Sequence, residues 1–131
     1  MSAAATAVPS RRREQTREGL RLLYLRARVC IQRHHAQPLT LGMVARALSS
    51  SPRQLERAFR DFGDTTFRAE LTRVRLGEAA RLLATQPLVV SDVAHRVGFR
   101  QAPHFCKAFK QAFGMTPGAY RDRAIRHRRT R

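Results

Sequence analysis

The sequence predicts an all-α fold in which two similar helix pairs are joined by one long helix. Three observations lead to this prediction. Apolar residues recur at helical spacing from about residue 16 onward. No segment reads as a strand, and one pattern of two helices with a tight turn occurs twice along the chain.

The N-terminal part is predicted to be a tail followed by a packing helix. Residues 1–15 show no periodicity and are expected to form a disordered tail, made basic near its end by Arg11, Arg12 and Arg13. A helix is expected over residues 16–35, ended by Pro38. One apolar stripe of this helix consists of Leu22, Leu25 and Val29. A second apolar set lies beside it and consists of Leu23, Ala27, Cys30 and Ile31.

The first helix pair completes an N-terminal subdomain over residues 16–66. Thr40 is expected to cap a helix, three serines to make the turn, and Ser51 with Pro52 to start the second helix. The residues expected to face inward are Leu41, Val44, Ala45 and Leu48, then Leu55, Ala58, Phe59 and Phe62. The opposite face of the second helix carries Arg53, Glu56, Arg57 and Arg60.

A linker helix over residues 67–86 is expected to connect the two pairs, with Pro87 after it. The second pair takes residues 87–121, and residues 122–131 form a basic C-terminal tail that begins as a short helix. In this pair Ser91 is expected to cap the first helix, Gly98 to end it in a left-handed conformation, and Pro103 to lie in the first turn of the second. The face predicted to be core holds Phe105, Ala108, Phe109, Ala112 and Phe113.

The two pairs align residue by residue. Val44, Ala45 and Leu48 match Val93, Ala94 and Val97 at one constant offset, whereas the later matches need an offset one residue greater. Those later matches join Leu55, Ala58, Phe59 and Thr66 to Phe105, Ala108, Phe109 and Thr116. The second turn is therefore predicted to be one residue longer than the first.

The charge of the chain calls for a polyanionic partner. Lysine and arginine number 26 against 9 acidic residues, a formal charge of +17. Nucleic acid fits this imbalance better than an anionic membrane. No apolar run approaches the roughly 18 residues of a spanning helix, and no apolar segment follows the early arginines as in a signal peptide. A cytoplasmic protein without a membrane partner is expected.

Catalysis and metal binding are not expected. Cys30 lies one helical turn from His34, and His104 is close to Cys106, yet no Cys-x-x-Cys pair supports zinc. Two cysteines do not make a disulfide framework. No nucleophile, base and orienting partner cluster, and no glycine-rich phosphate loop is present. The prediction is a protein that is not an enzyme and has no catalytic residue, cofactor or metal.

The second helix pair carries a distinctive ordered set of residues: Val93, Ala94, Gly98, Phe99, His104, Phe105, Lys107, Phe109, Lys110, Phe113, Gly114, Thr116, Pro117, Tyr120 and Arg121. The linker adds Arg75, Leu76, Ala79, Leu82 and Leu83. With these residues, the chain resembles the DNA-binding domain of the AraC/XylS family of bacterial transcription regulators over residues 22–121. The family resemblance implies a bilobed, homeodomain-like domain of two helix-turn-helix subdomains. Their recognition helices would enter successive major-groove segments about 34 Å apart.

The sequence departs from the family pattern at several positions. Ser49 stands where glycine is usual, so a strained or wider turn is expected there. Ala102 and Pro103 replace residues that are often polar, and Cys106 replaces a common serine. The chain resembles the short members that lack an effector-binding domain.

Both second helices offer residues suited to reading DNA. The expected base-reading residues are Arg53, Glu56, Arg57, Gln101, His104 and Lys107, and the expected phosphate contacts are Ser51, Arg60, Arg100, Lys110 and Arg121. Arg57 suits a guanine edge, and Glu56 either accepts from cytosine or holds a neighbouring arginine in position. The alternative to base contact for Lys107 is contact with phosphate alone. For Arg53 and Arg57 the alternative is an ion pair with a neighbour on a solvated helix surface.

These features predict a sequence-specific, double-stranded DNA-binding transcription regulator without its own effector domain, binding as a monomer to an asymmetric two-part site in the nucleoid. RNA polymerase is a further partner if the protein is an activator. Two alternatives stay open: a nucleoid-type protein that coats DNA without reading sequence, and the DNA-binding fragment of a longer ligand-responsive regulator. The phenylalanines of the second helices are expected in the core rather than stacked on bases.

Overall fold

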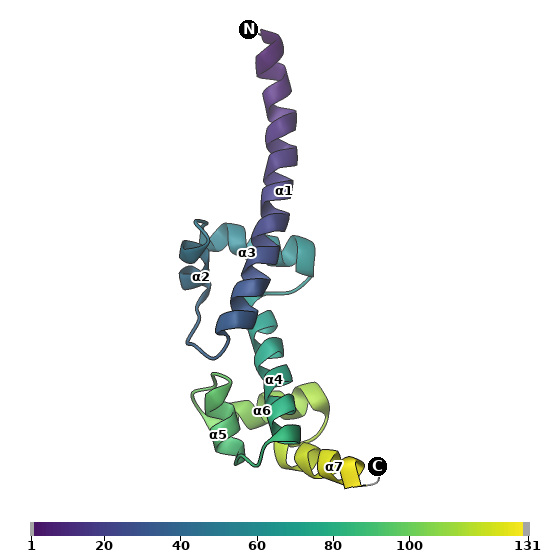
Figure 1. Cartoon of the computed structure of the whole chain (residues 1–131). Helices are drawn as coiled ribbons and strands as arrows, with labels where there is room; N and C mark the ends of the chain where they lie inside the picture. The colour runs from purple at the N-terminus through teal and green to yellow at the C-terminus, as the bar shows by residue number, and fades with distance from the viewer. Residues whose placement is uncertain (1, 130–131) are drawn as a thin grey trace. The chain divides into compact units, whose positions relative to one another are not determined.

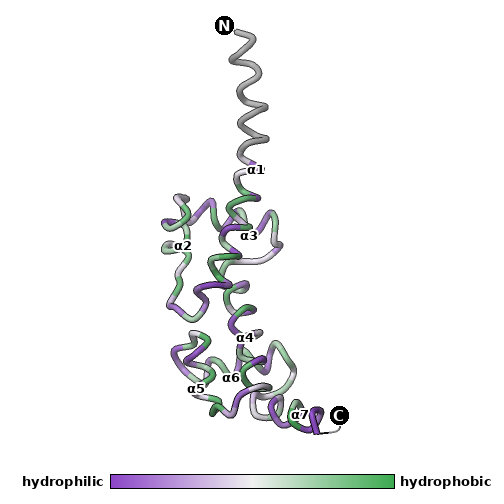
Figure 2. The backbone as a smooth tube through the Cα atoms, viewed as in Figure 1, coloured by the Kyte–Doolittle hydropathy of each residue, from purple (hydrophilic) through white to green (hydrophobic). Residues whose placement is uncertain are grey.

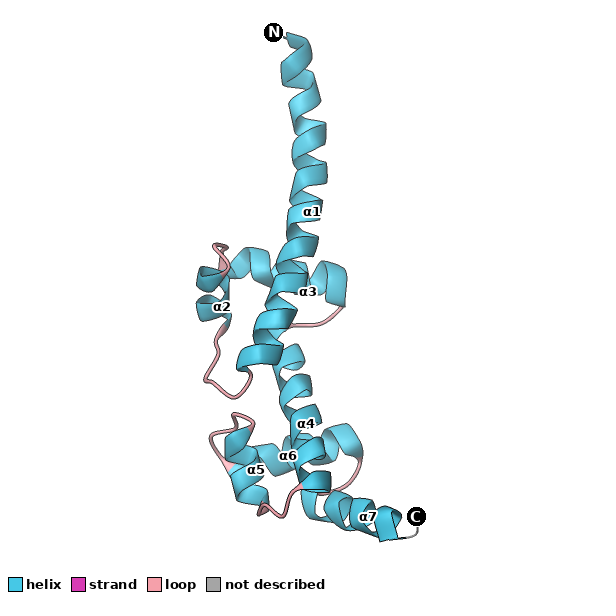
Figure 3. Cartoon of the chain, in the orientation of Figure 1, coloured by secondary structure: helices cyan, strands magenta, loops and turns pink. Residues whose placement is uncertain are grey.

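The computed structural model describes the backbone of residues 2–129 and the side chains of residues 16–129. Within these residues the chain forms seven helices and no strand, which confirms the all-α prediction (Figures 1 and 3). The helices are α1 (Ser2–His34), α2 (Leu41–Ala47), α3 (Pro52–Gly63), α4 (Phe67–Thr85), α5 (Val90–Arg96), α6 (Ala102–Phe113) and α7 (Pro117–Arg129).

The helices divide between two compact units, each built around one helix pair. Unit 1 holds the chain up to residue 33 and residues 39–70, with the pair α2 and α3. Unit 2 holds residues 34–38 and the chain from residue 71 onward, with the pair α5 and α6. The expected linker helix is α4, and it contributes its first turn to unit 1 and the rest to unit 2.

Helix α1 begins earlier than the sequence predicted. Its backbone is helical from Ser2, across the segment expected to be a tail, although the side chains before residue 16 lie outside the described ones. Four of the first seven residues are alanine, the strongest helix former. The basic side chains Arg11, Arg12 and Arg13 fall in that undescribed group, so their role remains a prediction.

Only one of the two apolar sets that the sequence shows in α1 is buried. Leu20, Leu23, Ala27 and Ile31 are buried, whereas Leu22, Leu25 and Val29 are exposed at 55%, 41% and 50%. Figure 2 shows the described part of α1 with apolar segments between hydrophilic ones. Apolar residues lie on two sides of this helix, and periodicity alone did not tell which side the rest of unit 1 covers.

Aromatic rings form the centre of unit 1. Phe59 of α3 is fully buried, and its ring meets those of Tyr24 and Phe67 edge to face, with centroids 5.4 and 6.0 Å apart. Val44, Ala45, Leu55 and Ala58 of the same unit are also buried. The inward face predicted for α3 is thus confirmed for Leu55, Ala58 and Phe59, while Phe62 is half-buried.

Unit 2 repeats this arrangement with its own ring cluster. Phe105 and Phe109 of α6 are fully buried, and Phe109 lies edge to face with Tyr120 of α7 at 5.4 Å between centroids. Val93, Ala94 and Val97 of α5 are also fully buried. Phe113 was expected in the core, but it is 37% exposed even though its ring lies 4.4 Å from that of Phe109. It lies at the C-terminal end of α6, where fewer residues cover it.

Side-chain caps start the helices of the first pair as predicted. The hydroxyl of Thr40 accepts from the backbone N–H of Met43 at 3.2 Å, and that of Ser51 accepts from Gln54 at the same distance. The prediction for Ser91 was wrong: the capping position of α5 is Val89, which makes no side-chain bond. Since α5 already begins at Val90, Ser91 lies inside its first turn.

The two turns differ by one residue, as the repeat predicted. The first turn takes residues 48–51 and the second residues 97–101. Each turn contains one left-handed residue at the matching position, with φ of 54° at Ser49 and 107° at Gly98. The strain expected at Ser49 is therefore present, since a non-glycine residue holds a positive φ there.

Gly98 is also closely surrounded. A Cβ atom at this position would lie 2.6 Å from the carbonyl oxygen of His35 and 2.7 Å from Nε of Arg75. Arg75 itself donates from Nε to that carbonyl and from Nη2 to the carbonyl of Gln37, at 2.7 and 2.8 Å. These bonds fasten residues 34–38 to α4 within unit 2, and burial lowers the pKa of Arg75 from its usual value.

Candidate nucleic-acid interface

The outward face of α3 gathers four of the predicted DNA contacts. Arg53, Glu56, Arg57 and Arg60 are all exposed and line one hollow. They lie together because α3 turns Leu55, Ala58 and Phe59 into the core, which leaves the opposite side to charged residues. Three arginine forks around one carboxylate give this surface a net positive charge.

An acidic residue that the sequence analysis did not single out lies at the end of this face. The carboxylate of Asp61 is 3.5 Å from Nε of Arg57 and 3.7 Å from Nε of Arg60. The four-residue spacing of Arg57 and Asp61 was the signal that would have revealed this pair. All three side chains are more than 40% exposed, so the ion pairs are weak and the guanidinium groups can exchange partners.

Glu56 does not hold an arginine in place in this structure. Within the described residues, no ion pair joins Glu56 to Arg53 or Arg57, and Arg57 pairs with Asp61 instead. Its carboxylate therefore lies exposed on the same face as the arginines.

Ser51 lies at the N-terminus of α3. Its hydroxyl oxygen accepts from the backbone N–H of Gln54, and the residue is exposed. A helix N-terminus with free N–H groups favours an anion, so the position suits the phosphate contact expected of it.

The outward face of α6 presents the predicted contacts of the second pair. Gln101 occupies the capping position without a side-chain cap bond, and His104 and Lys107 follow on the exposed side of the helix. Arg100 and Lys110 are exposed at its two ends. Cys106 is half-buried, so it lies at the edge of this face. All six predicted base-reading residues, three in each unit, are exposed.

Arg121 differs from the other predicted phosphate contacts. It is half-buried, and its guanidinium donates to the backbone carbonyls of Leu83 and Leu88, which lie at the end of α4 and in the segment after it. Two of its donors therefore serve unit 2 itself. A phosphate contact by Arg121 stays a prediction that its remaining donors would have to fulfil.

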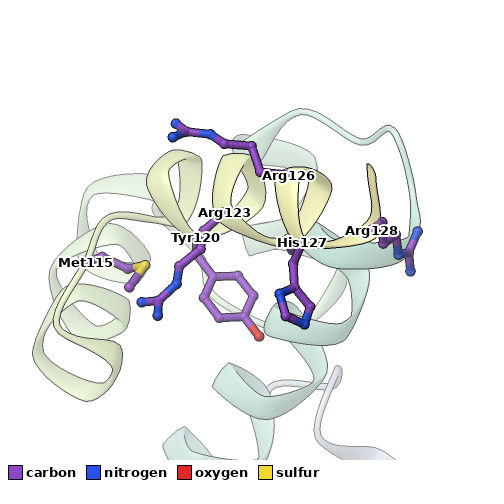
Figure 4. Close-up of a pocket in the computed structure, with 7 residues that line it drawn as sticks. Met115, Tyr120, Arg123, Arg126, His127 and Arg128 are labelled. Atoms are coloured by element: carbon purple, nitrogen blue, oxygen red, sulfur yellow. The ribbon is translucent and has the colours of Figure 1, made fainter. Parts of the chain in front are cut away.

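Helix α7 carries a basic surface that the sequence analysis had grouped with a tail. A hollow along this helix is lined by Met115, Tyr120, Arg123, Ala124, Arg126, His127 and Arg128 (Figure 4). In the close-up, Arg123 and His127 lie on either side of the Tyr120 ring, while Arg126 and Arg128 extend away from it. The density of arginine over residues 121–129 was the available signal, and the helical backbone arranges these residues in space.

Other kinds of site find little support in the part of the chain that the structure describes. Among residues 16–129, no group of three histidine, cysteine or acidic side chains is placed to hold a metal ion. Cys30 and Cys106 are free thiols. No helix in the same region is long and apolar enough to cross a membrane.

The sequence of this chain is similar to those of known regulators. A family model described as a helix-turn-helix domain matches residues 44–123. The chain is 40% identical over 88 residues to the HTH-type transcriptional regulator GlxA of Rhizobium meliloti, covering 67% of this chain and 27% of that protein. It is 40% identical over 99 residues to the transcriptional activator NphR of Rhodococcus, covering 76% and 29%. The match spans less than a third of either relative.

Solved structures show the same arrangement of helices. The C-terminal domain of AraT, a response regulator from Geobacillus stearothermophilus, superposes with a TM-score of 0.74 at 39% identity, covering 76% of this chain and 84% of that one. The DNA-binding domain of AdpA, a global transcriptional factor, gives a TM-score of 0.75 at 29% identity, covering 82% and 96%. The AdpA structure was solved in complex with a target DNA.

Proposed function

Since this chain belongs to the AraC-type family of helix-turn-helix transcription regulators, we propose that it reads a specific double-stranded DNA sequence with α3 and α6. The observation that carries the proposal is a repeated one. Each of these helices follows a tight turn, buries phenylalanine on one side and exposes basic and polar residues on the other. That combination presents side chains to a major groove while the core holds the helix rigid.

In unit 1, the proposed base contacts are Arg53, Glu56 and Arg57. The guanidinium of Arg57 can donate two bonds to O6 and N7 of guanine, and a carboxylate at Glu56 can accept from the amine of cytosine. Ser51 and Arg60 bind phosphates at the two ends of α3, which fixes the register of the helix in the groove. The weak ion pairs of Arg57 and Arg60 with Asp61 leave both guanidinium groups able to exchange this carboxylate for DNA.

In unit 2, the proposed base contacts are Gln101 at the capping position of α6 and His104 and Lys107 in its first half. Arg100 and Lys110 bind phosphates around them, joined by the free donors of Arg121. With two helices reading separate segments of the groove, the bound site is asymmetric and one monomer occupies it.

A second candidate function rests on the charge alone. A chain with a formal charge of +17 releases many counterions from any DNA that it binds. Such binding is the property of a nucleoid-type protein that coats DNA without reading its sequence. We favour sequence reading because the six exposed side chains proposed to bind base edges are concentrated at two helices rather than spread over the surface.

The proposal extends to the setting of the activity. The chain spans under a third of GlxA and NphR, so a ligand-responsive regulator with this chain as its DNA-binding part is the alternative to action without an effector domain. As a regulator of transcription it works on the chromosome in the bacterial nucleoid, with RNA polymerase as a further partner if it is an activator.

The test is selection of binding sites from a random duplex library, with the selected sites retested across a salt series. Sequence reading predicts two short motifs about one helical turn apart, and binding that random competitor DNA does not displace at moderate salt. If no motif emerges and the affinity collapses with salt in the same way on all sequences, the coating function is correct instead.

A further inference from the structure

Helix α1 carries an apolar stripe that no part of unit 1 covers. Leu22, Leu25 and Val29 are 55%, 41% and 50% exposed. They follow one another at three and four positions, so they share one side of the helix. The residues that pack into unit 1 from α1, Leu23, Ala27 and Ile31, lie on the other side.

The spacing of this stripe is that of helix-to-helix recognition. Side chains at i, i+3 and i+7 are the anchors with which one amphipathic helix meets another. The three residues extend over about two turns, or roughly 10 Å of helix. Because α1 already has a buried face of its own, the stripe is not needed to hold unit 1 together.

The charges beside the stripe restrict what can cover it. Arg26 and Arg33 lie along one edge of the stripe and Arg21 lies along the other, and all three are exposed. Glu18 is the one acidic residue of α1 whose side chain is described, and it lies a turn before Leu22. A partner helix therefore meets leucine and valine in the middle and positive charge on both sides.

We propose that the stripe of Leu22, Leu25 and Val29 docks an acidic amphipathic helix of another protein. Such a helix places its own apolar side chains on the stripe and its carboxylates against the three arginines. A second copy of this chain fits poorly, since pairing two α1 helices brings arginine against arginine. The stripe shares no residue with the proposed DNA-reading faces of α3 and α6.

The test measures binding of synthetic peptide helices of about 18 residues by fluorescence anisotropy at about 0.15 M salt. The first peptide has leucines at i, i+3 and i+7 flanked by glutamates. The second has the same composition with the leucines scrambled, and the third has lysines in place of glutamates. The proposal expects the first peptide to bind at least about tenfold more tightly than the other two.

Two variants locate the site. Replacing Leu22, Leu25 and Val29 together by glutamine should weaken the first peptide at least about tenfold. The matched control is Met43→Gln, which removes another exposed apolar residue of unit 1, 52% exposed, and should leave the affinity unchanged. Replacing Arg21, Arg26 and Arg33 by glutamate should reverse the preference, so that the lysine peptide binds in place of the acidic one.

Other results overturn the proposal. Equal binding of the scrambled peptide means that the overall positive charge attracts any acidic peptide. A concentration-dependent dimer in sedimentation, abolished by the triple glutamine variant, means that a second copy covers the stripe. DNA affinity of the same triple variant is measured alongside, and it should stay within about twofold, which keeps a failure here separate from a failure of the proposed DNA binding.

Discussion

Arg75 donates a hydrogen bond from Nε to the backbone carbonyl of His35 over 2.7 Å, although the two residues are 40 positions apart. With its second bond to Gln37 the guanidinium forms a fork on two carbonyls of one loop. The half-buried Arg75 side chain thus positions residues 34–38, a short segment that belongs to unit 2 although it precedes α4 in the chain. The stability of unit 2 should therefore depend on this side chain.

Replacing Arg75 by leucine should lower the free energy of unfolding by about 1–3 kcal/mol, because two carbonyls lose a charged donor. Urea denaturation followed by circular dichroism measures the change. Arg75→Lys keeps the charge without the fork and should recover only part of the loss. A leucine variant as stable as the parent would mean that water replaces both bonds without cost.

Adding one methyl group at Gly98 should destabilise the chain by more than about 2 kcal/mol, because alanine there meets both a φ of 107° and the carbonyl of His35 at 2.6 Å. Gly77→Ala is the matched control. Apart from its chain neighbours and the backbone of its own helix, no atom lies within 4 Å of the added Cβ at Gly77. The residue is in the middle of α4, so alanine should raise stability by up to about 1 kcal/mol. Thermal unfolding of the two variants should show shifts of opposite sign.

Truncating Arg57 to alanine should weaken binding to the selected DNA by about 1–3 kcal/mol and relax the preference at one base pair. Arg60→Ala should weaken binding on all sequences alike and reduce the salt dependence, as expected for a phosphate contact. The measurement is anisotropy titration against the selected site and its single-base variants. If Arg57→Ala loses affinity equally on every sequence, Arg57 is a phosphate contact as well.

Two serines near helix starts should respond differently to alanine. Ser51→Ala removes the bond to the N–H of Gln54 and should cost about 1 kcal/mol of stability. Ser91 makes no cap bond with its side chain, so Ser91→Ala should change the stability by less than about 0.5 kcal/mol. Urea denaturation of both variants distinguishes them, and an equal loss would restore Ser91 as the cap of α5.

The ion pair of Glu78 and Arg81 should make a small, pH-dependent contribution to the stability of α4. The hydrogen bond from Arg81, 2.6 Å from Nη2 to Oε1, lowers the pKa of the Glu78 carboxyl against an opposing effect of burial. Because the carboxyl has a lower pKa in the folded state than in the unfolded one, its ionised form stabilises the fold at pH values above the ordinary glutamate pKa. This contribution to stability is lost as the pH falls through the lowered pKa. Glu78→Gln should thus reduce the melting temperature slightly at pH 7 and not at about pH 3. If the melting temperatures of the parent and of Glu78→Gln differ by the same amount at both pH values, ionisation of Glu78 is not the cause of the difference.

The local features of the fold could be predicted because each depends on a few neighbouring residues. The caps at Thr40 and Ser51, the left-handed Gly98 and the extra residue of the second turn were all visible in the sequence. Ser91 was misassigned by the same kind of reasoning, since α5 starts two residues earlier than a cap at Ser91 implies and leaves the serine inside the helix.

The long-range features could not be predicted in the same way. The choice between the two apolar sides of α1 depends on where Phe59 lies, and the bonds of Arg75 and Arg121 reach carbonyls 33 to 40 positions away. Nothing local marks such partners. For the candidate site, the helices and their outward faces were predictable, whereas the ion pairs of Asp61 and the bonds of Arg121 to backbone carbonyls depend on how the chain folds.

The unequal surroundings of Ser49 and Gly98 have a consequence for how this repeat can change over evolutionary time. At the first turn a side chain is exposed, so mutation there meets only the modest cost of a left-handed backbone. At the second turn the carbonyl of His35 and the Arg75 guanidinium occupy the space, so every missense change of this codon adds a clash. Selection should therefore tolerate substitutions at position 49 and remove them at position 98. The two copies of the helix pair should diverge faster at the first turn, where the side chain is exposed, than at the second.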